Sequence, residues 1–287
     1  MKVPNEKPVV PEDLYNILAR ADRIVVKDSP MTDARTLFES TDKRDLADLR
    51  ASLLLETPAE SFHCMCIGTP ALYVYERGGK PVELTNHHGE SVRCSLWTSD
   101  VRISDTEKWL SWFDERRITS PRREVEAMRA QQEQGERDWD RWLAAMPKAI
   151  RAIWADALGQ FGSVDVTPLR AALERDMPDE RQRILALLEW FGSGAGPWSP
   201  CPSYETAAEE LLLGYSTMNI VKALESTKIS PAQTEGGARL FAGWSFRKQR
   251  PRGVNEVPDA LKKVLWNHVK DTEDKDKLGR AKRALSG

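Results

Sequence analysis

The spacing of hydrophobic and polar positions divides the chain into two parts. In the first part, short apolar runs rich in β-branched residues predict strands, because strand side chains alternate between the two faces of a sheet. The predicted strands cover 24–26, 36–38, 52–55, 62–67, 71–75, 82–85 and 91–97. Apolar residues at helical spacing predict helices at 11–20, 42–50 and 105–117.

After residue 120 the spacing of apolar residues becomes helical and stays so. Residues 129–138 are polar on every face, which suits a helix that crosses solvent between packed parts. An apolar stripe returns at Trp139 and Trp142 and continues in several short predicted helices. We therefore predict an α+β fold. A small antiparallel β-meander domain with helices occupies 1–118, a long polar linker helix 119–146, and an all-α domain, a helical bundle or hairpin stack, 147–287.

Composition favours a globular protein. The 287 residues are 40% hydrophobic and 30% charged, which excludes a fibrous repeat and a generally disordered chain. The sequence has no apolar run of the ~18 residues that a membrane span needs and no signal-peptide core, so we expect neither membrane insertion nor export. Two of the four cysteines are separated by a single residue, a poor start for a disulfide framework. We expect reduced thiols and a cytoplasmic location.

The charge of the chain is balanced, with 42 Lys and Arg against 44 Asp and Glu. A typical nucleic-acid-binding domain is strongly basic, so the overall charge argues against that class. One segment, 244–252, interleaves aromatic and basic residues, and Arg247 to Arg252 could contact nucleic acid. The same residues also suit a helix end whose basic side chains complement the helix dipole, and we prefer this second interpretation.

Cysteine and histidine concentrate between positions 63 and 94, where three of the four residues of each type lie. Thiolate and imidazole groups are preferred ligands of zinc in tetrahedral sites. A zinc site could therefore be formed by Cys64, Cys66, His88 and Cys94. Their spacing is not that of a known zinc motif, so the sequence supports this site only as a hypothesis.

The same segment permits thiol catalysis. In such a mechanism a thiolate is the nucleophile, an imidazole is its base, and an amide orients the imidazole ring. The candidates are Cys64 and Cys66 as nucleophile, His87 and His88 as base, and Asn86 as the orienting group. The position of both cysteines within the predicted strand 62–67 argues against this mechanism, because nucleophiles often occupy an exposed turn or helix start.

A structural role is the simplest interpretation of the cluster. Buried cysteines can act as small hydrophobic residues. The sequence His87-His88-Gly89 predicts a turn in which the glycine takes a positive φ. The imidazoles would then be bonded by Glu90, Arg93 or Asp100.

Segments 62–68 (FHCMCIG) and 87–93 (HHGESVR) give the chain a resemblance to a group of bacterial proteins. In this group, whose activity is uncharacterised, an HHG-containing β-module precedes a helical region. Segments 190–198 and 237–244 of the helical part resemble the same group. The resemblance implies a bacterial cytoplasmic protein and supplies no catalytic residue.

The two-part organisation, the balanced charge and the lack of an established catalytic motif favour a non-catalytic adaptor that presents a helical surface to a protein partner. The residues expected to contact that partner are Trp198, Trp244, Arg247 and Arg250, with Trp198 the best candidate for exposure because it follows a Gly-Pro turn. The alternatives are a thiol- or zinc-dependent enzyme centred on the Cys/His cluster, and nucleic-acid contact through Arg247 to Arg252. The adaptor hypothesis requires no cofactor, whereas the enzyme alternative would use zinc.

Overall fold

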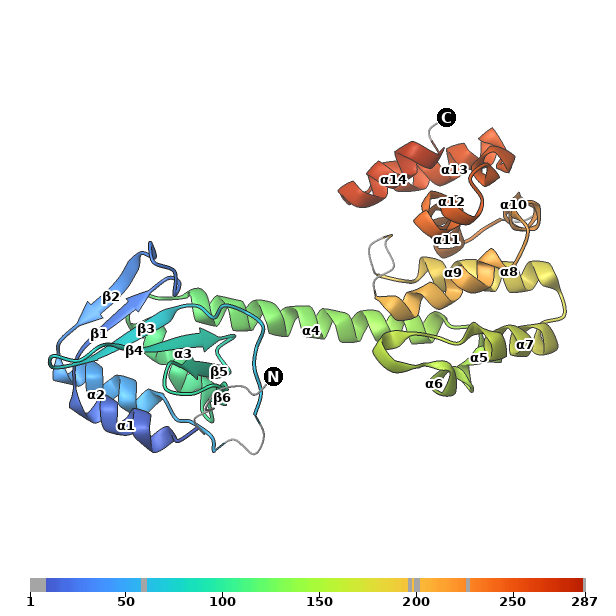
Figure 1. Ribbon diagram of the computed structural model, residues 1–287. Coiled ribbons are helices and arrows are strands. Elements are labelled where there is room, and N and C mark those ends of the chain that lie inside the picture. Colours follow the sequence, from blue (N-terminus) through green and yellow to red (C-terminus); the bar gives the residue numbers. More distant parts are fainter. Residues whose placement is uncertain (1–8, 58–60, 196–197, 199–201, 226–227, 286–287) are drawn as a thin grey trace. The chain divides into compact units, whose positions relative to one another are not determined.

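The protein consists of two compact units that share one long helix. The computed structural model describes residues 9–57, 61–195, 198, 202–225 and 228–285 (Figure 1). The first unit extends to Glu133 and the second begins at Gln134, so the boundary lies within helix α4 (Ser120–Ala145). None of the described helices is both long enough and apolar enough to span a membrane.

The first unit contains a six-stranded antiparallel sheet with the order β2-β1-β3-β4-β5-β6. Its strands are β1 (Ala21–Lys27), β2 (Thr36–Ser40), β3 (Ala71–Glu76), β4 (Val82–His87), β5 (Ser91–Cys94) and β6 (Val101–Arg102). Strands β3, β4 and β5 form the predicted meander. The α+β fold class is thus confirmed.

Three helices, α1 (Pro11–Arg20), α2 (Lys43–Ser52) and α3 (Thr106–Glu115), supply the apolar side chains that pack with one face of this sheet. The helices contribute Leu14, Leu49 and Trp109 to the core, and all three side chains are fully buried. On the sheet, every second residue joins the same core, as Leu72 and Val74 do on β3. Burial on this scale stabilises the unit by about 1.5–3 kcal/mol for each large apolar side chain.

The opposite face of β4 and β5 carries polar side chains, and the loop before β3 lies against it. Thr85 and His87 alternate with the core-facing residues of β4, and Arg93 lies opposite Thr85 on β5. The predicted strand 62–67 is wrong: the described residues 61–70 form an irregular loop. The predicted strand 52–55 is also wrong, because only Leu55 makes an isolated bridge.

Helix α4 is fixed to the first unit through its first turns. The Arg122 guanidinium forms ion pairs with Glu107 and Asp114 of α3. Val125 lies so close to Gly89 that a Cβ atom at Gly89 would be 2.6 Å from its Cγ2 atom. The β4–β5 turn and α4 are therefore in direct contact.

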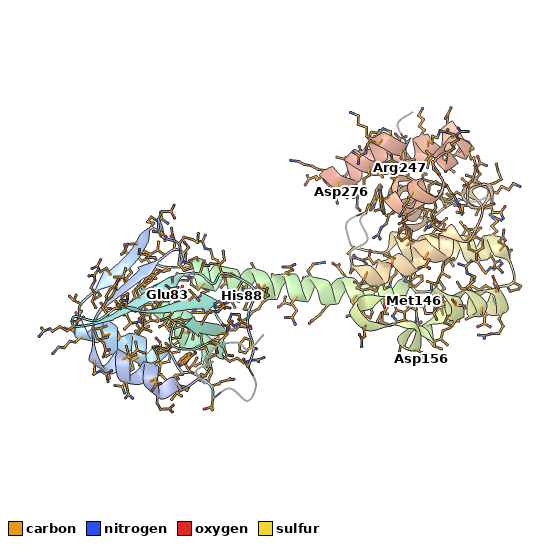
Figure 2. The ribbon with its side chains drawn as sticks, in the orientation of Figure 1. Glu83, His88, Met146, Asp156, Arg247 and Asp276 are labelled. Atoms are coloured by element: carbon orange, nitrogen blue, oxygen red, sulfur yellow. The ribbon has the colours of Figure 1, made fainter. Side chains whose placement is uncertain are left out.

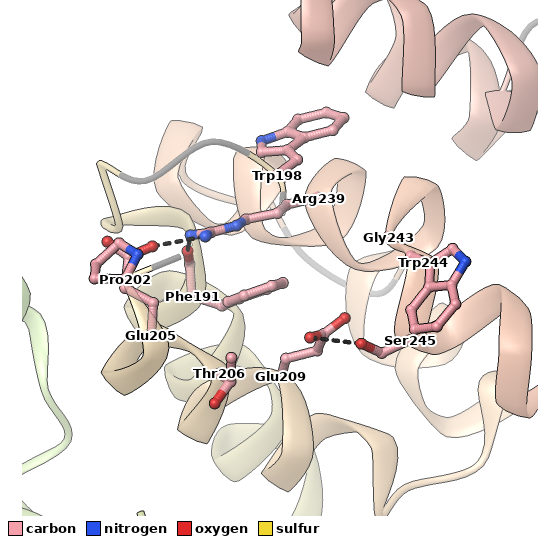
Figure 3. Close-up of a pocket in the computed structure, with 10 residues that line it drawn as sticks. All are labelled: Phe191, Trp198, Pro202, Glu205, Thr206, Glu209, Arg239, Gly243, Trp244 and Ser245. Atoms are coloured by element: carbon pink, nitrogen blue, oxygen red, sulfur yellow. Dashed lines mark hydrogen bonds and ion pairs between the residues drawn. The ribbon is translucent and has the colours of Figure 1, made fainter. Parts of the chain in front are cut away.

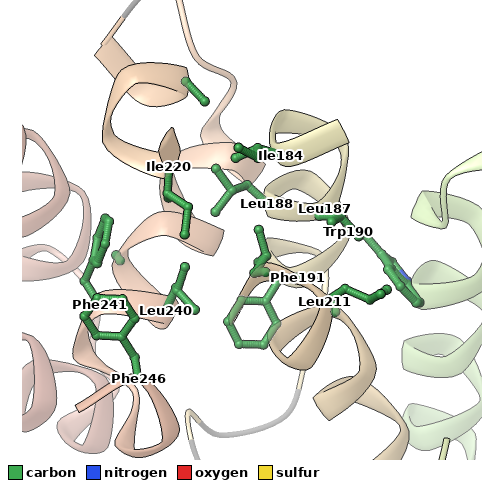
Figure 4. Close-up of a cluster of buried hydrophobic side chains, with 14 of the residues drawn as sticks. Ile184, Leu187, Leu188, Trp190, Phe191, Leu211, Ile220, Leu240, Phe241 and Phe246 are labelled. Carbon is green, nitrogen blue, oxygen red and sulfur yellow. The ribbon is translucent and has the colours of Figure 1, made fainter. Parts of the chain in front are cut away.

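Helices α5 to α14 belong to the second unit and enclose one continuous apolar core (Figure 4). Their bounds are α5 (Lys148–Arg151), α6 (Trp154–Ala157), α7 (Val166–Asp176), α8 (Glu180–Gly192), α9 (Thr206–Leu213), α10 (Thr217–Glu225), α11 (Pro231–Ala242), α12 (Trp244–Gln249), α13 (Asp259–Lys270) and α14 (Lys275–Leu285). Short 3-10 turns lie at η1 (Gln160–Gly162), η2 (Ser203–Glu205) and η3 (Gly253–Glu256). Helices α11 and α12 are separated by Gly243, whose backbone is extended.

The backbones of α8 and α11 in the second unit are in close contact. Gly192 of α8 faces the backbone of Ala232, and Gly236 of α11 faces the backbone of Leu188, with no room for a Cβ atom at either glycine. The ring centroids of Trp142 on α4 and Trp190 on α8 lie 4.6 Å apart. The two glycines thus let two helix backbones approach each other in the middle of the core.

Candidate metal centre

Two cysteines and one histidine meet beside the end of β4. Cys64 and Cys66 lie on the loop before β3. His88, labelled in Figure 2, directly follows β4. The Sγ atom of Cys64 lies 2.7 Å from the Sγ atom of Cys66 and 3.5 Å from His88 Nε2. One ligand atom of each residue lies within 4.8 Å of the other two. Across the described part of the chain, this is the group whose ligand atoms lie close enough together to hold one metal ion.

The position of Cys64 is fixed by backbone hydrogen bonds rather than by its side chain. Its N–H donates to Asp100 Oδ2 at 2.7 Å, and its carbonyl oxygen accepts from Arg93 Nη2 at 2.6 Å. Asp100 is fully buried and forms an ion pair with Arg93, whose Nε lies 2.7 Å from Oδ1. Burial acts to raise the pKa of Asp100, but the bonds from Arg93 and from the Cys64 backbone outweigh it and lower that pKa. An ionised, buried carboxylate therefore holds the backbone of the loop at Cys64.

The turn after β4 places His88 at the site. The Glu90 N–H donates to the carbonyl oxygen of His87, and the two central residues, His88 and Gly89, have φ angles of 55° and 71°. The positive φ predicted for Gly89 is confirmed. A positive φ is uncommon for a residue other than glycine, and such strained positions cluster at functional sites.

A carboxylate on α4 orients the His88 ring. His88 Nδ1 lies 2.8 Å from Glu124 Oε1, on the ring edge opposite the one that faces the thiols. This hydrogen bond raises the pKa of His88. A carboxylate bonded to the distal nitrogen of a metal-ligating histidine is a common second layer of zinc sites. Here it leaves Nε2 directed toward Cys64.

His87 contacts the site from the sheet but is not one of the three closely spaced groups. Its Nδ1 atom lies 3.0 Å from Cys66 Sγ, and its Nε2 atom lies 2.9 Å from Thr85 Oγ1. Burial lowers the pKa of His87, which favours the neutral ring. Gly68, with φ at 77°, lets the loop pass this ring, because a Cβ atom there would lie 2.6 Å from Nε2.

The two thiols of the loop differ in acidity. Hydrogen bonding from the Cys66 side chain and backbone lowers the pKa of Cys64. Burial and the neighbouring Cys64 sulfur raise the pKa of Cys66 to about 11. Of the two thiols, Cys64 is therefore the one that loses its proton more readily.

A cavity of about 360 Å³ opens beside His88. This volume is within the range of small-molecule sites. Its other lining residues come from the β4–β5 turn and from α4 and are Glu90, Val125, Met128, Arg129, Gln131 and Gln132. Their charged and amide side chains lie beside the apolar Val125 and Met128, so the cavity offers hydrogen-bond donors and acceptors to a polar ligand.

Two residues predicted for this site lie on the other face of the sheet. Cys94 is fully buried in the apolar core, and burial raises its pKa to about 12. Asn86 accepts a hydrogen bond from the Trp109 indole and donates to the Thr69 carbonyl oxygen, so it does not orient His87. Strand alternation explains both corrections, because Cys94 and Asn86 follow and precede residues that face the site.

The predicted partners of the imidazoles are mostly different from the observed ones. Asp100 lies 3.8 Å from His63 Nδ1, but His88 is bonded by Glu124, which was not among the predicted partners. No local pattern marks Glu124. Its role depends on the packing of α4 against the β4–β5 turn.

The second unit contains a small polar pocket (Figure 3). Its buried ion pair joins Arg239 Nη2 and Glu205 Oε2 at 2.6 Å, and the Arg239 guanidinium lies over the Phe191 ring. Nearby, Glu209 accepts from Ser245, and burial raises the pKa of Glu209. The cavity volume of about 20 Å³ has room for roughly one water molecule, so this is a structural polar cluster.

The predicted partner-binding tryptophans have opposite environments. Trp244 is 63% exposed at the start of α12, and Arg247 on the same helix is also exposed. Trp198 is only 4% exposed, so its expected exposure is wrong. Its indole N–H donates to Glu235 Oε1, which satisfies its polar atom while its rings join the apolar core.

The Arg250 guanidinium is hydrogen-bonded within the second unit. Its Nη2 atom donates to the carbonyl oxygens of Leu213 and Tyr215. Leu213 is the last residue of α9 and Tyr215 lies just after it, where main-chain acceptors lack helical partners. The structure therefore gives Arg250 a capping role.

Comparison with known proteins found no matching family model, no matching curated protein and no matching solved structure. The resemblance to bacterial HHG proteins stays a prediction.

Proposed function

We propose that this protein binds a zinc ion through Cys64, Cys66 and His88 and acts as a zinc-dependent enzyme. The observation that carries the proposal is the convergence of two sulfur atoms and one imidazole nitrogen within 4.8 Å of one another. Soft thiolates favour zinc, copper(I) and iron–sulfur clusters, and the mixture of thiolate and imidazole ligands is typical of zinc.

The composition of the ligand set favours catalysis over a purely structural role. Structural zinc sites have four protein ligands, whereas catalytic sites commonly have three and leave one position for water or substrate. The present set has three close ligand groups, and His88 also lines the cavity described above. A zinc ion at this position would supply Lewis acidity toward a water molecule or a substrate oxygen.

The protein's own groups have defined tasks in this proposal. Glu124 holds the His88 ring by its Nδ1 atom, and Asp100 holds the backbone of Cys64. His87, which is favoured in its neutral form, lies next to Cys66 and can hold a proton near that thiol. The exposed Arg129 and Glu90 line the cavity and would orient a polar substrate.

Elemental analysis of the full-length protein tests zinc binding directly. We expect about one equivalent of zinc in the wild type and in His63→Gln, a control in the same loop whose ring faces Asp100. Cys64→Ser, Cys66→Ser and His88→Gln should each lose most of the metal. Cobalt(II) loading should give thiolate-to-metal charge-transfer absorption. A wild type without metal and without this absorption would contradict the proposal.

A second candidate function, partner binding by the helical unit, is favoured by the exposure of Trp244. The Lys248 ammonium lies 5.1 Å from the centre of its ring, and Arg247 is exposed on the same helix. Tryptophan and arginine are enriched among residues that dominate protein interfaces. The adaptor hypothesis therefore rests on α12.

The test of this second candidate compares full-length variants against a partner isolated with the wild type. Trp244→Ala combined with Arg247→Ala should lose that partner. Val264→Ala, which changes another exposed apolar residue of the same unit, should retain it. Equal binding by both variants would contradict a role for α12.

A further inference from the structure

The two cysteines of the metal centre are arranged so that they can react with each other. Their sulfur atoms lie 2.7 Å apart, about 0.7 Å more than the length of a disulfide bond. Both side chains are partly exposed. A third described cysteine, Cys94, is fully buried on the other face of the sheet and cannot compete for either sulfur.

The side chains that alternate with the cysteines leave the loop open to solvent. Met65 is 96% exposed and Ile67 is 64% exposed. A small oxidant can therefore approach the sulfurs without unfolding of the sheet. The anchors of the loop, Asp100 and Arg93, bind its backbone and remain in place when the sulfurs change.

We infer that Cys64 and Cys66 form a site of reversible oxidation, and that their conversion to an intramolecular disulfide releases the metal ion. This inference rests on the proposed zinc site. A peroxide is the oxidant class that fits a small, partly exposed site, and hydrogen peroxide is its simplest member.

The reaction balances in two steps. In the first step, a thiolate sulfur attacks one peroxide oxygen, the O–O bond breaks, and the cysteine becomes a sulfenic acid. The second oxygen leaves as hydroxide, which takes up a proton to form water. In the second, the other sulfur attacks the sulfenic sulfur, an S–S bond forms, the S–O bond breaks and a second water leaves. Two thiols and one hydrogen peroxide thus give one disulfide and two waters.

Loss of the metal follows from the change in the sulfur atoms. Zinc binds thiolates, and a disulfide sulfur carries no such charge. Oxidation therefore removes two of the three close ligand groups together and leaves His88. Reduction by a dithiol restores both thiols and with them the site.

The experiment exposes full-length protein, zinc-loaded and metal-free, to hydrogen peroxide. Released zinc is followed with a chromophoric chelator, and tryptic peptides are analysed by mass spectrometry. Cys64 and Cys66 share the tryptic peptide 51–77, whereas Cys94 begins a different one. We expect near-complete zinc release, a loss of two hydrogen atoms from peptide 51–77, and recovery of zinc binding after reduction.

Control variants and outcomes separate this inference from the proposed function. Cys94→Ala should respond as the wild type does, and Cys66→Ser should form no disulfide in peptide 51–77. Zinc that stays bound after the disulfide forms, or zinc release with both thiols intact and only Met65 oxidised, would overturn the inference. A wild type that never binds zinc defeats the proposed function. In that case a disulfide in the metal-free protein still supports the oxidation site, and its absence overturns it.

Discussion

Asp100 Oδ2 accepts the backbone N–H of Cys64 at 2.7 Å across 36 positions of sequence. The carboxylate is fully buried, and Arg93 neutralises it while also donating to the Cys64 carbonyl oxygen. One ion pair therefore satisfies both backbone polar groups of a cysteine on an irregular loop. These hydrogen bonds fix the position of Cys64, a proposed metal ligand, although its loop has no regular secondary structure.

Asp100→Asn should destabilise the first unit and weaken metal binding. Loss of the negative charge leaves the Arg93 guanidinium without its partner, and breaking a buried ion pair costs about 3 kcal/mol. Urea unfolding and zinc titration would measure the two effects. Asp28→Asn serves as control because its ion pair with Arg35 is exposed and should contribute under about 1 kcal/mol. Equal unfolding free energies for the two variants would refute the anchoring role of Asp100.

Glu124→Gln should reduce zinc affinity by about 10- to 100-fold without removing a ligand. The amide cannot hold the His88 ring as a carboxylate does, so the ligating nitrogen becomes less basic and less well oriented. Competition with a chromophoric chelator gives the affinity. Glu126→Gln, an exposed neighbour on the same helix, should bind zinc as the wild type does. If Glu124→Gln matched that control, Glu124 would have no part in the metal site.

Gly236→Ala should unfold the second unit or destabilise it by more than about 3 kcal/mol. A methyl group at this position overlaps the backbone of Leu188, and neither helix can move away without opening the core. Gly135→Ala on α4 is the opposite case, because its Cβ atom would meet no other group within 4 Å. That variant should gain about 0.5–1 kcal/mol from helix propensity. Thermal unfolding followed by circular dichroism would distinguish them, and a stable Gly236→Ala protein would refute the close contact of α8 and α11.

Glu235→Gln should remove a pH-dependent part of the second unit's stability. Burial acts to raise the pKa of Glu235, but the bond from Lys277 and its positive charge, with the Trp198 indole, outweigh burial and lower that pKa below its usual 4.5. A carboxylate whose pKa falls on folding stabilises the native state above its unfolded pKa, and this contribution is lost as pH falls through the folded pKa.

The wild type should therefore exceed Glu235→Gln in unfolding free energy near neutral pH, and the difference should shrink in acid below pH 4.5. Urea titrations at several pH values measure this difference. Glu256→Gln, an exposed carboxylate of the same unit, should show little difference at any pH. A gap between wild type and Glu235→Gln that is constant with pH would refute the ionised state of Glu235.

The sequence pattern predicted much of the fold because helices and strands depend largely on residues that are close in sequence. Period-two alternation identified β3 and β4, and helical spacing identified α1 and α3. The pattern failed at residues 62–67, a mostly apolar run in which Met65 and Ile67 are exposed to solvent. A pattern cannot distinguish a strand from a loop whose alternate side chains turn inward to a site. The prediction that Trp198 is exposed was wrong for a related reason, because Glu235, which accepts its indole hydrogen bond, is distant in sequence.

The sequence by itself determined the α+β class, the meander of β3 to β5, the turn at His88 and Gly89, and the grouping of cysteines and histidines in one segment. Short-range backbone preferences and side-chain periodicity are sufficient for these features. Only the tertiary structure decided which members of that group meet. It brought Cys64, Cys66 and His88 together, turned Cys94 into the core, and supplied Asp100 and Glu124 as supports. These choices depend on strand register and on the contact of α4 with the β4–β5 turn, which arise from packing between distant segments.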